Sequence, residues 1–381
     1  MPHPDKKSSI ETLAVHAGRA TDKISGAVTP SIQLSTTFER DADGGYSRGY
    51  EYIRNENPNR GALEESIAAL ERGDWAVAFS SGTAATATLF QAAAKKGVIV
   101  SSTAAYHGTL KQLRELNKQN GGSVRFVDSG SVDEVENVLD DDVSLLFIET
   151  PANPMMGISN IRKLAAAAAR HSAAFACDNT FATPVLQNPL TLGADLVVHS
   201  ATKYLGGHSD LMSGVVAGRS PGGWSEELAT LRATGGAVPS PFDCWLLQRS
   251  LPTLPVRVRT QSAAALLVAN FCTTRPEIEN VLYPGLPAHP GHRIAAGQMS
   301  GFGGMLSIRL AGGDEAARGV AARVRLFTRA TSLGGVESLI EHRASIEGPD
   351  TETPDDLLRL SIGLEHPDDL IADLAQALDK I

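Results

Sequence analysis

Short apolar runs alternate with helical segments through the middle of the chain, and this alternation limits the possible fold more than any other feature. The apolar runs are 97–100, 124–127, 143–148, 173–176 and 196–198, and helical segments lie between them at 109–117, 132–139 and 161–170. Such alternation predicts an α/β layer with a largely parallel sheet. Because ligands bind at the carboxyl ends of the strands in these sheets, the polar residues that follow the runs are the first candidates for a site.

The remainder of the chain is arranged around this layer. Turn-forming residues such as Gly44-Gly45 and Pro58 interrupt the first part of the chain, which predicts a set of loops. A proline-broken stretch at 239–255 indicates a boundary, and the mixed helices and strands beyond it predict a smaller α+β domain. We therefore expect an N-terminal arm at 1–60, a large domain at 61–245 and a C-terminal domain at 246–381.

Charge and cysteine content exclude several classes of function. The net charge of −9 argues against nucleic acid or an anionic membrane as the main partner. The three cysteines, Cys177, Cys244 and Cys272, are odd in number and far apart, which predicts neither a disulfide framework nor a metal site and fits a reducing, cytoplasmic setting. Residues 1–10 lack the apolar core of a signal peptide, and no apolar run is long enough to span a membrane.

A lysine among small hydroxyl residues follows the last apolar run of the layer. Lys203 lies close to Ser200 and Thr202, which could bind an anion, and to Gly206-Gly207, which allows close backbone approach. Burial would lower the pKa of its amine, and a neutral amine can form a Schiff base with a carbonyl compound. A lysine in a turn at the sheet edge would show the same residues, so the motif alone leaves both interpretations open.

Two further clusters follow strands in the same layer. Asp178 could pair with a protonated ring nitrogen, although an Asp that caps a turn would look the same. Ser81, Gly82 and Thr83 begin a helix whose exposed amides could bind phosphate, although an ordinary serine cap is the simpler reading. Taken together, a phosphate cradle, an acid for a pyridine nitrogen and a lysine for an aldehyde are the three attachment points of pyridoxal phosphate.

With these clusters in place, the sequence resembles the Cys/Met-metabolism, or trans-sulfuration, family of fold-type I pyridoxal-phosphate enzymes. The motifs that carry the resemblance run from Val15-His-Ala-Gly18 through Tyr52-Ile-Arg54-Asn-Glu-Asn57-Pro58, Ser81-Gly82-Thr83, Glu149-Thr150-Pro151-Ala-Asn153-Pro154, Asp178-Asn179-Thr180 and Ser200-Ala-Thr-Lys203 to Ser332-Leu-Gly-Gly-Val-Glu337 and Leu358-Arg359-Leu-Ser361. The resemblance implies a mostly parallel seven-stranded sheet in the large domain and a homotetramer built as a dimer of dimers.

The resemblance also implies a role for individual residues. Lys203 would hold the cofactor and move protons, Asp178 would pair with the pyridine nitrogen, and Tyr106 would stack on the ring and help to activate the leaving group. The remaining implied cofactor contacts are Ser81, Gly82, Thr83, Asn153, Thr180, Ser200 and Thr202, with Tyr52 and Arg54 reaching the cofactor of a neighbouring subunit. Arg359 would bind the substrate α-carboxylate, with Ser332, Glu337 and Asn153 in the substrate site.

The chain departs from the family pattern in two places. Asn59 stands where relatives commonly have Thr, and His342-Arg-Ala-Ser-Ile-Glu347 stands where many have a Met-Thr-His element. The second departure is near the substrate entrance in the family, so it bears on the substrate rather than on the cofactor.

The resemblance favours chemistry at Cγ of a sulfur-related amino acid. Cystathionine γ-synthase-like replacement, from an O-acylated homoserine and cysteine, agrees best with 286–292 and 332–339, and cystathionine γ-lyase is the nearest alternative. Gly108 disfavours a methionine γ-lyase, Leu333 disfavours a β-lyase, and an O-acylhomoserine sulfhydrylase is a further alternative. A plain aminotransferase and a non-catalytic cofactor-binding regulator are the competing readings, and the second would be expected to have lost Lys203, Arg359 or Tyr106.

Overall fold

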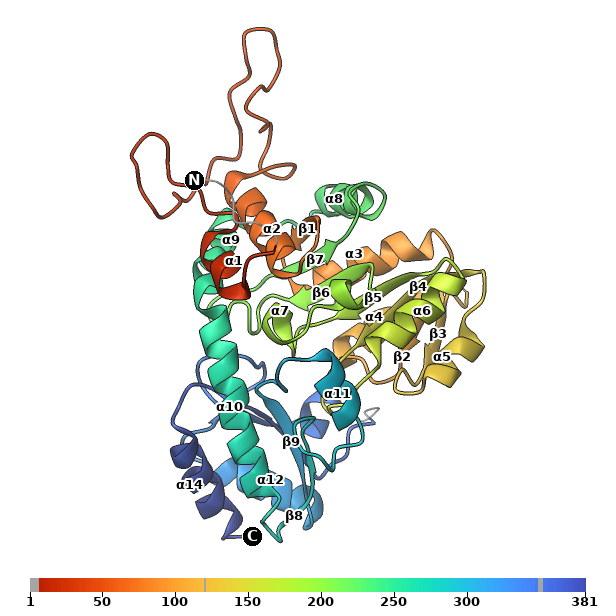
Figure 1. The fold of residues 1–381 in the computed structure, drawn as a ribbon, viewed down its shortest axis with the longest axis vertical. Coiled ribbons are helices and arrows are strands. Elements are labelled where there is room, and N and C mark those ends of the chain that lie inside the picture. Colours follow the sequence, from red (N-terminus) through yellow and green to blue (C-terminus); the bar gives the residue numbers. More distant parts are fainter. Residues whose placement is uncertain (1–6, 120, 349–351) are drawn as a thin grey trace.

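A seven-stranded sheet forms the centre of the larger part of the molecule (Figure 1). The computed structural model describes residues 7–119, 121–348 and 352–381. The strands follow the order β1 (Trp75–Phe79), β7 (Gly214–Gly218), β6 (Leu196–Ser200), β5 (Ala174–Asp178), β4 (Val143–Glu149), β2 (Val98–Ser102) and β3 (Val124–Val127). Only β7 runs antiparallel to its neighbours, which confirms the mostly parallel seven-stranded sheet.

Helices cover both faces of this sheet. The helices of this part of the chain are α2 (Pro58–Leu70), α3 (Gly82–Ala94), α4 (His107–Gln119), α5 (Val132–Val138), α6 (Ile161–Arg170), α7 (Thr183–Leu186), α8 (Trp224–Gly235) and α9 (Pro241–Ser250), with a 3₁₀ turn at Pro189–Leu192. In β4, Leu145 and Phe147 pack into the core beneath α3 and α8, whereas Leu146 and Ile148 pack toward α5 and α6. Successive residues of a strand point to opposite faces, so a continuous apolar run belongs to a sheet that is covered on both sides.

A second, five-stranded sheet carries the C-terminal part of the chain. Its order is β10 (Thr328–Arg329), β11 (Leu339–His342), β12 (Leu357–Ser361), β9 (Met305–Leu310) and β8 (Ile278–Leu282), and its strands are antiparallel except for β10 and β11. The accompanying helices are α10 (Leu254–Cys272), α11 (His292–Gln298), α12 (Gly313–Arg323), α13 (Ala344–Glu347) and α14 (Pro367–Leu378). This agrees with the α+β composition expected from the sequence.

The stretch at 239–255 is not the irregular break that its prolines suggested. It holds α9, a 3₁₀ turn (Leu251–Thr253) and the start of α10, with Pro241 and Pro255 in the first turns of the two α-helices. Proline is tolerated there because the first amides of a helix have no intrahelical acceptor. The hydrophobic core changes within α10, where Val258 packs with the large sheet and Ala265 with the small one. The domain limits expected at 60 and 245 stay predictions.

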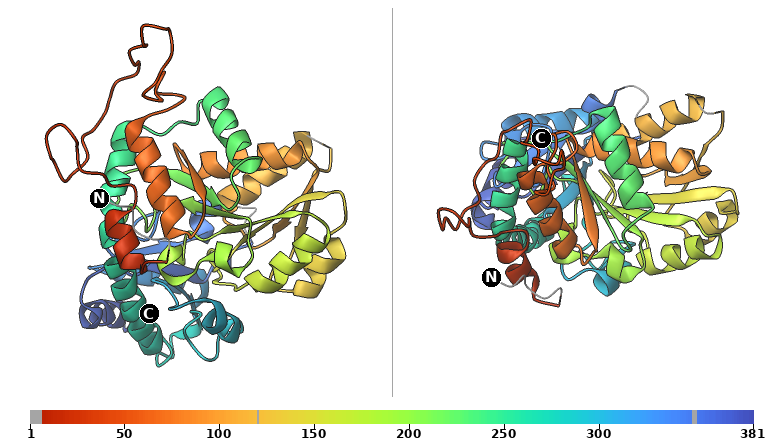
Figure 2. Two further views of the ribbon diagram at one scale, coloured as in Figure 1. Left: turned by 45° about the horizontal axis from the view of Figure 1, so that its top comes forward. Right: turned by 90° about the horizontal axis from the view of Figure 1, so that it is seen from above.

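The N-terminal region projects as loops away from the two sheets (Figure 2). It contains one short helix, α1 (Ile10–His16), followed by irregular chain up to α2; residues 1–6 of the predicted arm lie outside the described residues. Ile24, Val28 and Leu34 are 98%, 75% and 63% exposed, so this loop leaves apolar side chains without cover in a single chain. No helix in the described residues is long and apolar enough to cross a membrane.

Candidate active site

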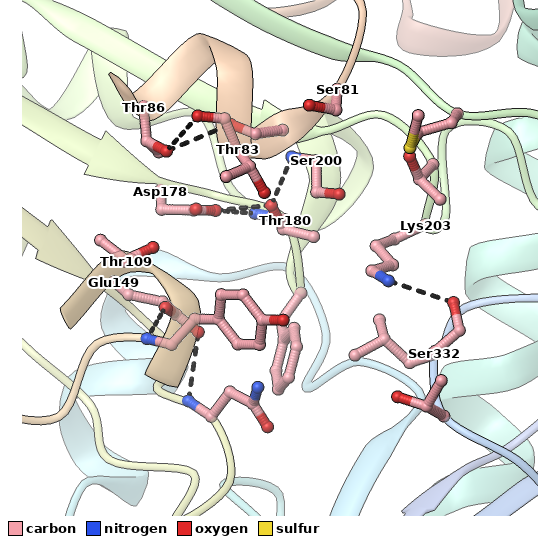
Figure 3. Close-up of a pocket in the computed structure, with 18 of the residues that line it drawn as sticks. Ser81, Thr83, Thr86, Thr109, Glu149, Asp178, Thr180, Ser200, Lys203 and Ser332 are labelled. Carbon is pink, nitrogen blue, oxygen red and sulfur yellow. Dashed lines mark hydrogen bonds between the residues drawn. The ribbon is translucent and has the colours of Figure 1, made fainter. Parts of the chain in front are cut away.

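One cavity lies where the carboxyl ends of β4, β5 and β6 meet the start of α3 (Figure 3). It encloses about 930 Å³ including its open mouth. The predicted site residues that line it are Ser81, Gly82, Thr83, Tyr106, Asn153, Asp178, Thr180, Ser200, Thr202, Lys203, Ser332 and Arg359. Residues from distant parts of the sequence therefore meet where the strand–helix alternation placed the site.

Asp178 is held in a fixed position at the end of β5. Its Oδ1 accepts hydrogen bonds from the backbone N (2.9 Å) and Oγ1 (2.5 Å) of Thr180, whose Oγ1 in turn accepts from the N of Ser200 (2.9 Å). Burial raises the pKa of Asp178, while the Thr180 hydrogen bonds and then His199 act in the opposite direction. The Oδ2 atom accepts no hydrogen bond within the described part of the chain, so one carboxylate oxygen is free to receive a proton donor in the cavity.

Glu149 is a second buried carboxyl beside Asp178, and the sequence analysis did not assign it to the site. The two residues are register partners on β4 and β5. Glu149 Oε2 accepts from the backbone N of Tyr106 (2.6 Å) and Oε1 from that of Asn153 (3.2 Å), which joins two loops of the cavity. Burial, and then the charge of Asp178, raise the pKa of Glu149 well above its usual value.

The start of α3 supplies unpaired backbone donors. The first four N–H groups of a helix lack intrahelical acceptors. Here the N of Ala84 bonds to the Ser81 side chain (3.0 Å) and the N of Ala85 to the Ser81 carbonyl (3.0 Å), which leaves the amides of Gly82 and Thr83 for a ligand. A Cβ on Gly82 would fall 2.8 Å from Ser200 Cβ, so only glycine lets this helix end approach the Ser200 hydroxyl so closely.

Lys203 reaches the opposite side of the view in Figure 3 from Asp178. Its Nζ donates to Ser332 Oγ at 3.1 Å. Burial, followed by the nearby charge of Arg359, lowers the pKa of Lys203 to about 8. Near neutral pH, the neutral and nucleophilic form of this amine is therefore much more populated than in an ordinary lysine.

Arg359, on β12, lies deep at one end of the cavity. It donates to Asn153 Oδ1 (3.0 Å), to the carbonyl of Ser332 (2.9 Å) and to Glu341 Oε2 (2.5 Å). Burial lowers its pKa to about 10, which still leaves the guanidinium charged near neutral pH. A planar cation with remaining N–H groups beside Lys203 suits an amino-acid carboxylate.

Three predicted site residues lie outside the cavity. Tyr52 and Arg54 are on the projecting arm, where an Arg54 N–H donates to the carbonyl of Ala233 at 3.1 Å. Glu337 accepts a hydrogen bond from the Ser209 hydroxyl and does not line the cavity. The predicted roles of Tyr52, Arg54 and Glu337 therefore stay predictions, because none of these residues lines this cavity.

Several lining residues were not assigned from the sequence. They are Thr86, Thr109, Gln112, Glu149, Phe181, Met212, Thr331, Leu333 and Arg343. Thr86, Thr109 and Gln112 lie one or two helical turns after assigned positions, so helical spacing was the available signal. Arg343 lies in the segment where the chain departs from the family pattern, and that departure was the signal for it.

The fold and this set of side chains define a pyridoxal-phosphate-dependent enzyme of fold type I. The chain belongs to the family of Cys/Met metabolism PLP-dependent enzymes, whose model matches residues 11–379. It is 46% identical over 377 residues to a cystathionine gamma-synthase of Mycobacterium tuberculosis, with 97% of each protein covered. It is 41% identical to a cystathionine gamma-lyase of Dictyostelium discoideum, with 97% of this chain and 98% of the relative covered.

A solved structure agrees with this assignment. The crystal structure of metB from Corynebacterium glutamicum superposes with a TM-score of 0.96 at 43% identity, covering 99% of this chain and all of the other. The protein is thus an enzyme of trans-sulfuration chemistry that acts on small amino-acid substrates with pyridoxal phosphate as its cofactor. The close approach that Gly82 permits, the unpaired amides beside it, the free Asp178 oxygen and the buried Lys203 amine fit the phosphate, ring nitrogen and aldehyde of this group.

Proposed function

We propose that the enzyme carries out γ-replacement, joining cysteine to the four-carbon chain of an O-acylated homoserine to form cystathionine. The observation that carries this proposal is the single cavity that holds Lys203, Asp178 and Arg359 within a chain so similar to a γ-synthase. The three side chains match an aldehyde, a pyridine nitrogen and an α-carboxylate, in that order.

The cofactor would be held by residues of α3, β5 and β6 and of neighbouring loops. The amides of Gly82 and Thr83 and the hydroxyls of Ser200 and Thr202 would bind the phosphate, since all four residues line the cavity and Gly82 lies against Ser200. Asp178 would accept from the ring nitrogen through its free oxygen, with Thr180 fixing the carboxylate, and Tyr106 would cover the ring. When bound, the protonated pyridine ring stabilises negative charge at the substrate α-carbon.

Lys203 and Arg359 would then act on the amino acid. Arg359 binds the α-carboxylate and so fixes the position of Cα. Lys203 Nζ takes the proton from Cα in its neutral form, which its lowered pKa makes available. A proton is then lost from Cβ as the γ-substituent leaves, and Lys203 returns protons to Cβ and Cα after the thiol has added at Cγ. Ser332 Oγ orients Nζ through the hydrogen bond between them.

Cystathionine γ-lyase activity is the second candidate. The similarity to the Dictyostelium discoideum relative favours it. The same three residues, Arg359 for the substrate carboxylate, Lys203 for proton transfer and Asp178 for the ring nitrogen, would serve elimination. In replacement a thiol adds at Cγ, whereas in elimination no group adds there and water hydrolyses the product to a 2-oxo acid and ammonia.

Product analysis separates these candidates. The purified enzyme is incubated separately with O-succinylhomoserine, O-acetylhomoserine, cystathionine and methionine, each with and without cysteine. We expect cystathionine from an O-acylhomoserine only when cysteine is present. Release of a 2-oxo acid and ammonia from cystathionine, with no cysteine-dependent product from either ester, would assign the lyase activity instead.

We also propose that each active site is completed by a second chain. Tyr52 and Arg54 would contribute to the phosphate site of a neighbouring subunit, and the exposed Ile24, Val28 and Leu34 would be covered in the assembly. Two such dimers would pair as a homotetramer, in keeping with the prevalence of symmetric homo-oligomers.

A further inference from the structure

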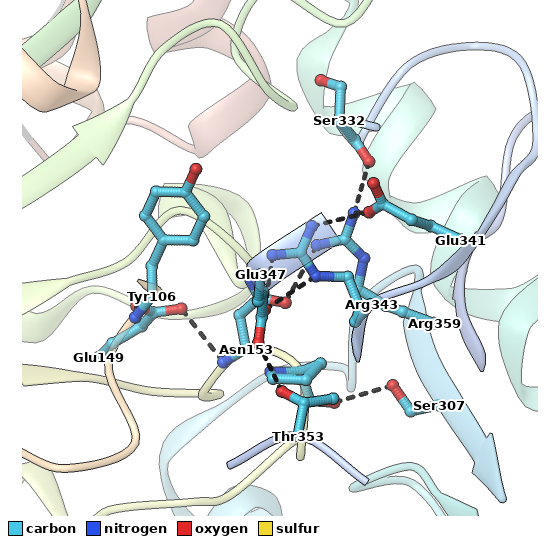
Figure 4. A network of polar contacts seen from close by, with 11 residues as sticks. Tyr106, Glu149, Asn153, Ser307, Ser332, Glu341, Arg343, Glu347, Thr353 and Arg359 are labelled. Atoms are coloured by element: carbon cyan, nitrogen blue, oxygen red, sulfur yellow. Dashed lines mark hydrogen bonds and ion pairs between the residues drawn. The ribbon is translucent and has the colours of Figure 1, made fainter. Parts of the chain in front are cut away.

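The segment that departs from the family pattern forms a buried ionic network behind the proposed carboxylate site (Figure 4). Arg343 lines the cavity together with Arg359, and each side chain is only 4% exposed. Arg343 donates to Glu347 through Nε (3.1 Å) and Nη2 (2.6 Å), and to Glu341 through Nη1 (2.9 Å). Two guanidinium groups and two carboxylates therefore meet at one end of the cavity.

Glu341 is shared between the two arginines through a single oxygen. Its Oε2 accepts from Arg343 (2.9 Å) and from Arg359 (2.5 Å). Its Oε1 is buried and accepts no hydrogen bond in the part of the chain that the structure describes. Glu341 and Arg359 are cross-strand partners on β11 and β12, so the carboxylate lies next to Arg359 whatever Arg343 does. A carboxylate in this position would ordinarily form a bidentate salt bridge with the guanidinium, in which each carboxylate oxygen accepts one hydrogen bond.

We propose that Arg343 is a positioning residue that determines how well the site binds an amino-acid carboxylate, because it holds Glu341 to a one-oxygen contact with Arg359. Without Arg343, Glu341 would turn its unpaired oxygen toward Arg359 and occupy the N–H groups that the substrate requires. Arg343 thus prevents the Glu341 carboxylate from competing with the substrate carboxylate for Arg359. The inference rests on the carboxylate-binding role of Arg359 in the proposed function.

The other contacts of Arg343 support this arrangement. Glu347 fixes the guanidinium from the far side and accepts a further hydrogen bond from Thr353 Oγ1 (2.7 Å). Asn153 and the Ser332 carbonyl hold Arg359 on its other edges, so Arg359 itself has little freedom to move away from Glu341. Arg343 therefore affects Arg359 through the orientation of the Glu341 carboxylate.

The test is a double-mutant cycle on the holoenzyme with Arg343→Met, Glu341→Gln and their combination. The probes are L-alanine, which has no γ-substituent to lose, and L-alaninamide, which lacks the carboxylate. The dissociation constant is read from the change in absorbance of the bound cofactor. Arg309→Met is the matched control, because Arg309 pairs with the buried Asp356 in the same sheet but outside the cavity.

We expect Arg343→Met to weaken L-alanine binding by about tenfold to a hundredfold, the range that follows from losing a hydrogen bond to a charged group. Arg343→Met should change the dissociation constant of L-alaninamide little, and Arg309→Met should change that of L-alanine little. In the Glu341→Gln background, where no carboxylate competes, adding Arg343→Met should have a much smaller effect. A purely structural role would not produce this rescue.

Unchanged L-alanine binding by Arg343→Met would overturn the proposal, and so would weakened binding that Glu341→Gln does not rescue. If Arg343→Met is not recovered folded, Glu341→Gln alone decides: wild-type or tighter L-alanine binding supports a competing role for Glu341, and weaker binding contradicts it. The wild-type enzyme separates this from the proposed function. If the wild-type enzyme does not bind L-alanine more tightly than L-alaninamide, Arg359 does not bind the substrate carboxylate. The assignment of Arg359 in the proposed function and the present proposal on Arg343 would then both be wrong.

Discussion

Lys203 has a lowered pKa because its amine is buried beside Arg359 without a carboxylate in contact. Protein without its cofactor should therefore capture pyridoxal phosphate at a rate that rises with pH, is half-maximal near pH 8 and levels off at higher pH, as the amine becomes neutral. An ordinary lysine would keep its amine charged to a much higher pH, since its pKa is near 10.4. Stopped-flow absorbance measures the profile, and a rise centred two pH units higher would show that Lys203 is not desolvated as described.

Arg359 carries the second prediction at this scale. Removing one partner of a desolvated charge pair costs about 2–5 kcal/mol, so Arg359→Ala should weaken amino-acid binding by roughly 30-fold or more. The cofactor spectrum should change little, because Lys203, Asp178 and the residues of the phosphate site do not bond to this side chain; of the assigned cofactor contacts, Asn153 does. Substrate titration monitored by absorbance gives the dissociation constant, and a near-normal value would remove Arg359 from the carboxylate site.

The sequence alone could assign a residue to the site only where that residue lies at or just after the end of a predicted strand, or at the start of a predicted helix. Asp178 and Lys203 follow neighbouring strands, so the carboxyl-end rule was enough to bring them together. Glu341 is brought next to Arg359 by the β11–β12 register, which no local pattern reveals. Tyr52 and Arg54 were assigned through the family resemblance, and a single chain leaves them outside the cavity.

At the level of elements, the start of α3 is the part of the site most sensitive to small changes. Gly82→Ala places a Cβ 2.8 Å from Ser200, and overpacking of this kind costs about 1–3 kcal/mol. We expect cofactor affinity to fall by about fivefold to a hundredfold. Gly61→Ala in α2 is the control, because its Cβ would meet nothing within 4 Å. Equal cofactor affinity in both variants, measured by fluorescence titration, would contradict the phosphate site at α3.

The elements themselves were predictable where a local pattern was strong. The helix at 161–170 and the strand at 124–127 have the bounds that the sequence indicated. The strands β1 and β7 were missed because Ala and Gly contribute much of their sequence and favour strands weakly. The helix α9 was read as part of a break because the prolines of the 239–255 stretch were taken as interruptions, whereas Pro241 lies in the first turn of α9.

For the whole molecule, the shared active site is the main prediction. Arg54→Ala and Lys203→Ala should each be inactive alone, and mixing them under conditions that exchange subunits should restore activity. Hybrid dimers would contain one site with both residues intact. The control is a mixture in which exchange is prevented. No recovery despite exchange demonstrated by mass spectrometry would mean that Arg54 serves its own chain.

The most direct test of the central claim is to identify the residue that binds the cofactor. The holoenzyme is reduced with borohydride, which makes the lysine–cofactor bond permanent, then digested and mapped by mass spectrometry, with Lys203→Ala treated in parallel. The account predicts that the cofactor is found on the peptide containing Lys203 and that the variant retains none. A cofactor bound to any other lysine, or a reduced adduct that survives in the variant, would contradict the assignment of this cavity as the active site.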